Sequence, residues 1–133
     1  MKNMDYFNEA FGGFDPLSDK DAAMKFCLNA VLMDCRFVDL DRLLPDVSNV
    51  GGIEGEPGWI IERRNEGDTL GYEGWPELAR FRAFVEPDSY GLAFPEFFCD
   101  RSTFTSLVSS AVRAYCDRHP EKNHVANILK RLS

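Results

Sequence analysis

Apolar residues recur with a helical period in three parts of the chain. Residues 18–34 carry a broad apolar face behind Ser18, a residue type that favours the N-cap position, and we predict a largely buried helix there. Residues 102–120 carry the clearest stripe, which predicts a helix capped by Ser102 and ended by a proline. A shorter helix is predicted over about residues 123–132. The three faces consist of Ala22, Ala23, Phe26, Cys27, Ala30, Val31 and Met33; of Phe104, Leu107, Val108, Ala111, Val112 and Tyr115; and of Val125, Ile128, Leu129 and Leu132.

Shorter apolar runs in the middle of the chain indicate extended structure. The run WIIERR at 59–64 is rich in β-branched and aromatic residues and predicts a strand. TLGY at 69–72 is a candidate return strand after the turn sequence NEGD. GLAFPEFFC at 91–99 predicts an extended segment that Pro95 confines to a sheet edge or a bulge.

Two segments have patterns that fit either a helix or a strand. In GWPELARFRAFV, at 74–85, Pro76 suits the first turn of a helix and apolar residues follow at helical spacing, so a helix is predicted. The alternation from Phe81 to Val85 also fits a strand. FVDLDRLLPD, at 37–46, fits a short strand or one helical turn.

The ten residues VGGIEGEPGW, at 50–59, hold four glycines and a proline, a composition typical of a loop. A glycine-rich loop that binds phosphate presents backbone N–H groups and usually a lysine, whereas Glu54 and Glu56 would repel the anion. The surrounding sequence offers no active site for the segment to close over. We therefore interpret it as a mobile loop that binds another protein.

The bulk composition predicts one folded unit. With 133 residues, 44% of them hydrophobic, the chain is large enough to bury a single core. The order of elements predicts an α+β fold in which residues 1–133 form a single domain, with a small, mainly antiparallel sheet packed with about four helices. Acidic residues near the N-terminus do not resemble an export signal, and the longest uncharged stretch, residues 102–112, is too short to span a bilayer. We expect a cytoplasmic protein that does not bind membranes.

The net charge of −7 is unevenly distributed along the chain. Residues 1–100 hold 20 acidic and 9 basic side chains, whereas residues 101–133 hold 2 acidic and 6 basic ones. An acidic chain repels nucleic acids and anionic membranes, so no direct contact with nucleic acid is expected. Acidity by itself is common among soluble proteins, but where it reflects a partner it favours a basic protein.

Few residues are candidates for catalysis or metal binding. Cys116 and His119 lie three positions apart on a predicted helix, and a zinc site could add His124 and Cys99. His119, however, precedes a proline at the helix end, where a histidine is a common favourable cation. Its spacing from His124 is not the i, i+4 spacing of helical zinc enzymes. We expect Cys116, like Cys27, to be a small buried apolar residue.

The acidic residues also give no strong catalytic pattern. Glu73 and Glu77 are four positions apart, but Gly74 and Pro76 between them prevent one continuous helix from presenting both. The chain has no nucleotide-binding loop, nucleophile elbow or metalloprotease motif. We predict that it is not an enzyme, with no catalytic residues, no metal site and no cofactor.

Two segments, GYEGWPEL at 71–78 and DRSTFTSLVSSAVRAYCDRHP at 100–120, resemble small bacterial immunity proteins encoded beside polymorphic toxins, including those of contact-dependent growth inhibition systems. The shared features are a G-Y-x-x-W-P stretch and a helix with F-x-x-L-V-x-x-A-V spacing. The resemblance implies a cytosolic, non-enzymatic inhibitor that binds one cognate toxin, commonly a basic nuclease, and blocks its active site. Contact residues do not carry over, because the binding surfaces of such families diverge quickly.

Aromatic and acidic residues concentrate between residues 54 and 77, where only Arg63 and Arg64 are basic. Interfaces use Trp and Tyr as anchors, and acidic residues steer a basic partner, although at least one tryptophan is expected in the core. The predicted toxin contacts are Glu54, Glu56, Trp59, Glu66, Asp68, Tyr72, Glu73, Trp75 and Glu77. The alternatives are a small cytosolic enzyme that uses Cys116 and His119, and an acidic adaptor or nucleic-acid mimic.

Overall fold

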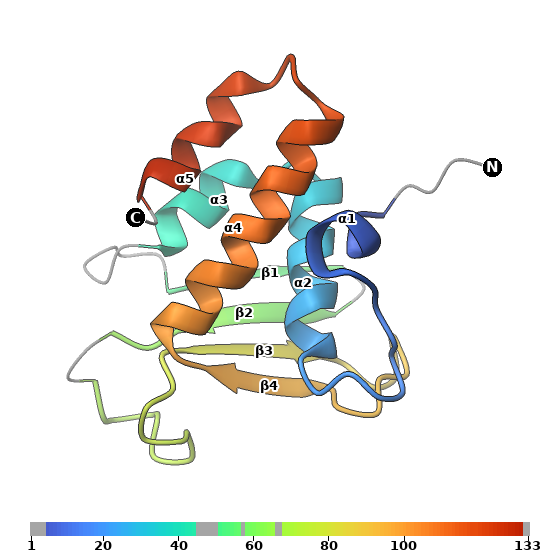
Figure 1. Ribbon diagram of the computed structural model, residues 1–133. Coiled ribbons are helices and arrows are strands. Elements are labelled where there is room, and N and C mark those ends of the chain that lie inside the picture. Colours follow the sequence, from blue (N-terminus) through green and yellow to red (C-terminus); the bar gives the residue numbers. More distant parts are fainter. Residues whose placement is uncertain (1–4, 45–50, 57, 66–67, 132–133) are drawn as a thin grey trace.

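A four-stranded antiparallel sheet covered on one face by helices forms the fold in the computed structural model (Figure 1). The structure describes residues 5–44, 51–56, 58–65 and 68–131. The strands are β1 (Gly52–Gly55), β2 (Trp59–Arg63), β3 (Phe81–Val85) and β4 (Glu96–Cys99), and their order in the sheet follows their order in the chain. The helices are α1 (Phe7–Phe11), α2 (Ala22–Met33), α3 (Phe37–Leu43), α4 (Arg101–Arg118), the 3₁₀ turn η1 (Asn123–Ala126) and α5 (Asn127–Arg131). This confirms the predicted α+β fold.

The core lies between the sheet and the helices because alternate strand residues point toward the helices. In β2 and β3, every second residue is buried, beginning with Trp59 and ending with Val85. From α4, Phe104 stacks on Phe81 of β3 with ring centroids 3.8 Å apart. The predicted helical stripes are confirmed here, since α2 is almost fully buried between sheet and α4, and the α4 stripe faces the core. One predicted member of the α2 face is wrong: Met33 is 47% exposed.

Both predicted N-caps are wrong. Helix α2 begins at Ala22, four residues after Ser18, and the acidic residues of the intervening turn instead pair with Lys25, at 3.0 Å from Asp19 and 3.4 Å from Asp21. Helix α4 is capped by Asp100, whose carboxylate accepts the backbone N–H of Thr103 at 2.8 Å. At both sites, aspartates near the predicted serine cap bind the local polar group: Lys25 at the start of α2, and the backbone N–H of Thr103 at the start of α4.

Part of the predicted loop at 50–59 forms a strand, whereas Glu56 and Gly58 lie in a turn. Gly52–Gly55 forms the edge strand β1, paired with β2, and Ile53 is 2% exposed in the core. The predicted return strand at 69–72 does not form. That segment belongs to a turn in which the N–H of Tyr72 donates to the carbonyl oxygen of Thr69 at 3.0 Å, so the neighbours of β2 are β1 and β3 instead.

Of the two segments whose patterns fit either a helix or a strand, one contains a strand and the other forms a helix. Residues 74–85 do not form the predicted helix: a turn at Pro76–Ala79 is followed by β3, so the alternative strand pattern is confirmed. Residues 37–43 form the short helix α3. The segment at 91–99 contributes β4, which is an edge strand as predicted. The final predicted helix is divided into η1 and α5, with Val125 and Ile128 buried, and Leu132 lies outside the described residues.

Within the described residues, no helix is both long enough and apolar enough to cross a bilayer.

Candidate protein-binding face

The sheet face turned away from the helices carries both charged and apolar side chains. In Figure 1 the helices lie together on one side of the sheet. The pleat and the strand register place seven side chains on the other side. We call them the outer face: Glu54, Ile60, Glu62, Arg82, Phe84, Glu96 and Phe98.

Arg82 occupies the centre of the outer face. Its guanidinium contacts Glu62 at 2.5 Å on one neighbouring strand and Glu96 at 2.6 Å on the other, and it lies over the ring of Phe84, 4.9 Å from the centroid. Burial opposes the charged form, but the hydrogen bonds that Arg82 donates to the two carboxylates outweigh it and raise the pKa of Arg82. The central cation is therefore neutralised by its own neighbours.

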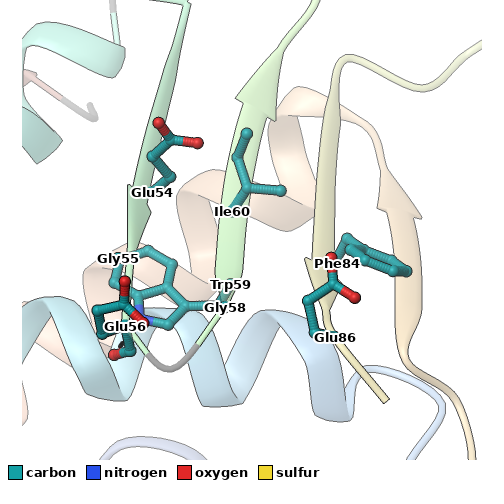
Figure 2. A pocket seen from close by; sticks show the side chains of 8 residues that line it. All are labelled: Glu54, Gly55, Glu56, Gly58, Trp59, Ile60, Phe84 and Glu86. Atoms are coloured by element: carbon teal, nitrogen blue, oxygen red, sulfur yellow. Dashed lines mark hydrogen bonds between the residues drawn. The ribbon is translucent and has the colours of Figure 1, made fainter. Parts of the chain in front are cut away.

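An open hollow of about 500 Å³ lies at the end of the sheet where β1 turns into β2 (Figure 2). Ile60 and Phe84 supply apolar surface, and the carboxylates of Glu54, Glu56 and Glu86 surround it. Among the described residues, no hydrogen bond or ion pair engages these three carboxylates. The nearby cation Arg36 donates to the backbone carbonyl oxygen of Glu54, at 2.5 Å, and pairs its charge with Asp39. The hollow is therefore anionic and open to a positively charged group.

Close packing explains the glycines around this hollow. A Cβ atom on Gly55 would lie 2.8 Å from the ring of Trp59, which donates its indole N–H to the carbonyl oxygen of Glu56 at 3.2 Å. Gly58 has φ +100°, and a Cβ there would lie 2.9 Å from the side chain of Glu86. The glycines thus let the tryptophan ring and the Glu86 side chain approach the backbone. The prediction of a loop is wrong for the residues that form β1.

The opposite end of the outer face carries an aromatic cluster. Trp75 packs edge-on against Tyr72 and Phe98, with centroid distances of 5.0 and 5.3 Å. Arg64 lies over the ring of Tyr72 and donates to the carbonyl oxygen of Asp68 at 2.7 Å. The loop of residues 68–80 is therefore anchored to the sheet by ring contacts, which hold it on the outer side.

The predicted toxin contacts divide into two groups at opposite ends of β2. Glu54 and Glu56 lie at the hairpin end, whereas Asp68, Tyr72, Glu73, Trp75 and Glu77 lie in the loop at the other end, about 13 Å away at 3.3 Å per strand residue. Trp59 is only 2% exposed, so its ring belongs to the core, as expected for at least one tryptophan. Glu66 lies outside the described residues.

Glu73 differs from the other acidic residues of the loop because its carboxylate already has a partner. Both oxygens accept the backbone N–H of Gly71, at 3.1 and 3.0 Å. Hydrogen bonds from its own backbone N–H and from that of Gly71 lower the pKa of Glu73. This carboxylate shapes the turn, and both Glu73 and Glu77 are exposed in the loop.

Sequence reasoning missed Ile60, Phe84, Glu86 and Phe98, which connect the two groups. The alternation of buried and partly buried residues in WIIER and FRAFV could have identified Ile60 and Phe84. In a strand, the residues between buried positions face outward. The predicted helix over 74–85 concealed this pattern for Phe84. Glu86 follows β3 and joins the hollow only through the approach to Gly58.

Among the residues that the structure describes, none forms a hydrogen bond with Cys116 that could make it a base for the thiol. His119, the residue that follows α4, has its Nε2 2.9 Å from the hydroxyl of Tyr6 and its Nδ1 3.6 Å from a carboxylate oxygen of Glu121. Burial raises the pKa of the half-buried Cys116 thiol and of the fully buried Cys27 thiol, which disfavours the nucleophilic thiolate. Among the described residues, no group of three or more His, Cys, Asp or Glu side chains is arranged to hold a metal ion.

No protein-family model, curated protein sequence or solved structure matches the chain.

Proposed function

We propose that this chain is an immunity protein that neutralises a cognate toxin domain by covering its basic active site. The observation that carries the proposal is the hollow at the hairpin end, where Glu54, Glu56 and Glu86 present three carboxylates without partners among the described residues. Unpaired surface carboxylates of one sign favour association with a positively charged protein.

The proposed mechanism is steric exclusion assisted by charge. A toxin that cleaves nucleic acid has a cationic cleft, because it must bind phosphates. The anionic end of the sheet would meet the lysine and arginine side chains of that cleft and form charge-assisted hydrogen bonds with them. Nucleic acid would then be excluded, and no reaction by the inhibitor is required.

Co-expression tests this proposal in bacterial host cells. The chain is produced together with the toxin domain encoded beside its own gene, and colony formation is counted. We expect the wild-type chain to restore growth and the purified pair to form a one-to-one complex. Charge reversal in the variant E54K/E56K should weaken protection without lowering the melting temperature, because both side chains are exposed.

The matched control is the variant D34K/D117K, which makes the same change in charge on the helical layer. Asp34 follows α2 and Asp117 lies in α4, and both are exposed. This control should protect cells as well as the wild-type chain does. A wild-type chain that neither binds the neighbouring toxin domain nor restores growth would overturn the proposal.

A further inference from the structure

The outer face departs from the usual pattern of a sheet that is covered on one side. In such antiparallel sheets, the residues that face solvent are normally polar. Here Ile60 and Phe84 face outward on two neighbouring strands and are only partly buried, whereas Phe98 is packed against Trp75. Large apolar side chains on an uncovered face are typical of a surface that another molecule covers.

The charges on this face indicate the kind of molecule that would cover it. Five carboxylates lie on the outward side of the strands, in the hairpin turn or directly after β3, those of Glu54, Glu56, Glu62, Glu86 and Glu96. Only one cation, Arg82, opposes them at these positions, and it is already shared between Glu62 and Glu96. The complementary surface is therefore positively charged and has an apolar centre.

We propose that the outer face is the docking surface for the basic toxin domain, which would form a second layer over the sheet. Its apolar contact would rest on Ile60 and Phe84, and its basic side chains would lie among the carboxylates at the hairpin end. This inference rests on the proposed function, because the occupant is the toxin. It places the centre of the interface on the strands, whereas sequence reasoning placed it on the loops.

The two kinds of residue on this face have separate kinetic roles. Exposed acidic residues accelerate the encounter with a basic partner, and salt screens that effect. Apolar side chains at the centre of an interface lose their contacts only when the complex separates, so they control the dissociation rate. Phe84 and Ile60 therefore hold the complex together, whereas Glu54 and Glu86 speed its formation.

Binding kinetics test whether the interface is centred on the outer face. The immobilised chain is exposed to the toxin domain encoded beside its gene, and association and dissociation rates are measured for Phe84→Ala, for Ile60→Ala and for E54Q/E86Q. We expect each apolar variant to raise the dissociation rate about tenfold or more, with little change in association. E54Q/E86Q should lower the association rate several-fold at low salt and lose this effect at high salt.

Control variants test whether the helices, on the other side of the sheet, contribute to binding. Val38 of α3 is 66% exposed, and Val38→Ala should leave both rates unchanged. D34N/D117N carries the same change in charge as E54Q/E86Q and should also leave them unchanged. Thermal melting confirms folding, and Ile60→Ala provides the test of the apolar centre if Phe84→Ala unfolds.

The outcomes separate the two proposals. If the toxin binds the wild-type chain but the Ile60 and Phe84 variants dissociate at the wild-type rate, the interface lies elsewhere and this inference is overturned while the proposed function stands. If the toxin domain does not bind the wild-type chain, both proposals are overturned. Slower association together with faster dissociation in the respective variants supports both.

Discussion

At the scale of single residues, the hairpin end depends on contacts that leave no room for a side chain on Gly55. The indole of Trp59 lies directly against this residue, and the ring itself is enclosed in the core. Aromatic rings packed in this way cannot rotate aside as the end of a flexible side chain can. The glycine is therefore required by packing.

Gly55→Ala should destabilise the protein by about 1–3 kcal/mol, because the new methyl group would lie 2.8 Å from the Trp59 ring. Urea denaturation monitored by tryptophan fluorescence measures this change in the free energy of unfolding. Gly51→Ala is the matched control, since a Cβ there would meet no atom within 4 Å. Equal stability of the two variants would contradict the packing argument.

Asp100→Ala should lower the melting temperature at neutral pH, whereas Ser102→Ala, at the cap position that the sequence suggested, should not. Hydrogen bonds from the backbone N–H and the hydroxyl of Thr103 lower the pKa of Asp100 below its usual value of about 3.9. A lowered folded-state pKa means that the cap stabilises the protein above the unfolded-state pKa. The contribution is lost as the pH falls through the folded-state pKa.

Melting curves recorded between pH 7 and pH 3 check the sign of this effect. The difference in melting temperature between wild type and Asp100→Ala should be largest near neutral pH and should shrink toward pH 3. A difference that grows as the pH falls would show that Asp100 does not act through its ionised carboxylate.

At the scale of elements, the short helix α1 depends on one side chain of α4. Arg118 donates to the carbonyl oxygen of Asp5 at 2.7 Å, pairs with the carboxylate of Glu9, and places its guanidinium 4.0 Å from the ring centroid of Tyr6. A helix of five residues is not stable in isolation, so these contacts and the burial of Tyr6 and Ala10 hold it in place.

Arg118→Ala should release α1 from α4 and cost about 1.5–3 kcal/mol, the range for hydrogen bonds to charged groups. Hydrogen exchange should accelerate at residues 6–11, while the amides of β2 and β3 keep their protection. Arg113→Ala is the control, because Arg113 is exposed on the same helix. Unchanged exchange at residues 6–11 would show that burial of Tyr6 alone is sufficient.

Elements with strong periodicity could be predicted from the sequence, and those without it could not. The stripe of α4 and the alternation of β2 identify both elements, because their side chains repeat the geometry of the backbone. β1 was missed because three of its four residues are Gly or Glu and only Ile53 enters the core. Its pairing with β2 is a tertiary property, which local composition does not contain.

The candidate site was predictable only in part, because strand pairing, which local sequence does not reveal, brings some of its residues together. Glu54 and Glu56 were predicted as contacts because they are close together in the sequence, although a loop and not a hairpin was expected there. Phe84 and Glu86 lie near them only because β2 pairs with β3. The intervening segment of residues 64–80 has little periodicity, so nothing local indicated which strands are neighbours.

At the scale of the whole molecule, the sheet region accounts for the entire net charge. Residues 51–100, which hold the four strands, contain 11 acidic and 4 basic side chains. The segments before and after them contain 9 acidic with 5 basic and 2 acidic with 6 basic side chains, so these two segments offset each other. The helical layer is thus nearly neutral, and the charge is concentrated where the outer face lies.

Association with the proposed toxin domain should therefore depend strongly on salt. Raising the ionic strength from 0.01 to about 0.5 M shortens the screening length several-fold, and we expect the association rate to fall about tenfold or more. The E54K/E56K variant should show a weaker dependence on salt in the same measurement. A complex that forms at the same rate at all salt concentrations would place the contact on the nearly neutral helical layer.

In β2 and β3, residues that pack in the core alternate with residues that face outward, so core packing and partner binding constrain different positions. Ile61 and Ala83 fill the core, whereas Ile60 and Phe84, their neighbours in the chain, face outward. Substitutions at the outward positions leave the volume of the core unchanged, so they avoid the cost of a cavity or of overpacking in the core. A gene for this fold can therefore acquire a new partner preference by single-codon changes at every second position of two strands, while the positions between them preserve the same folded scaffold.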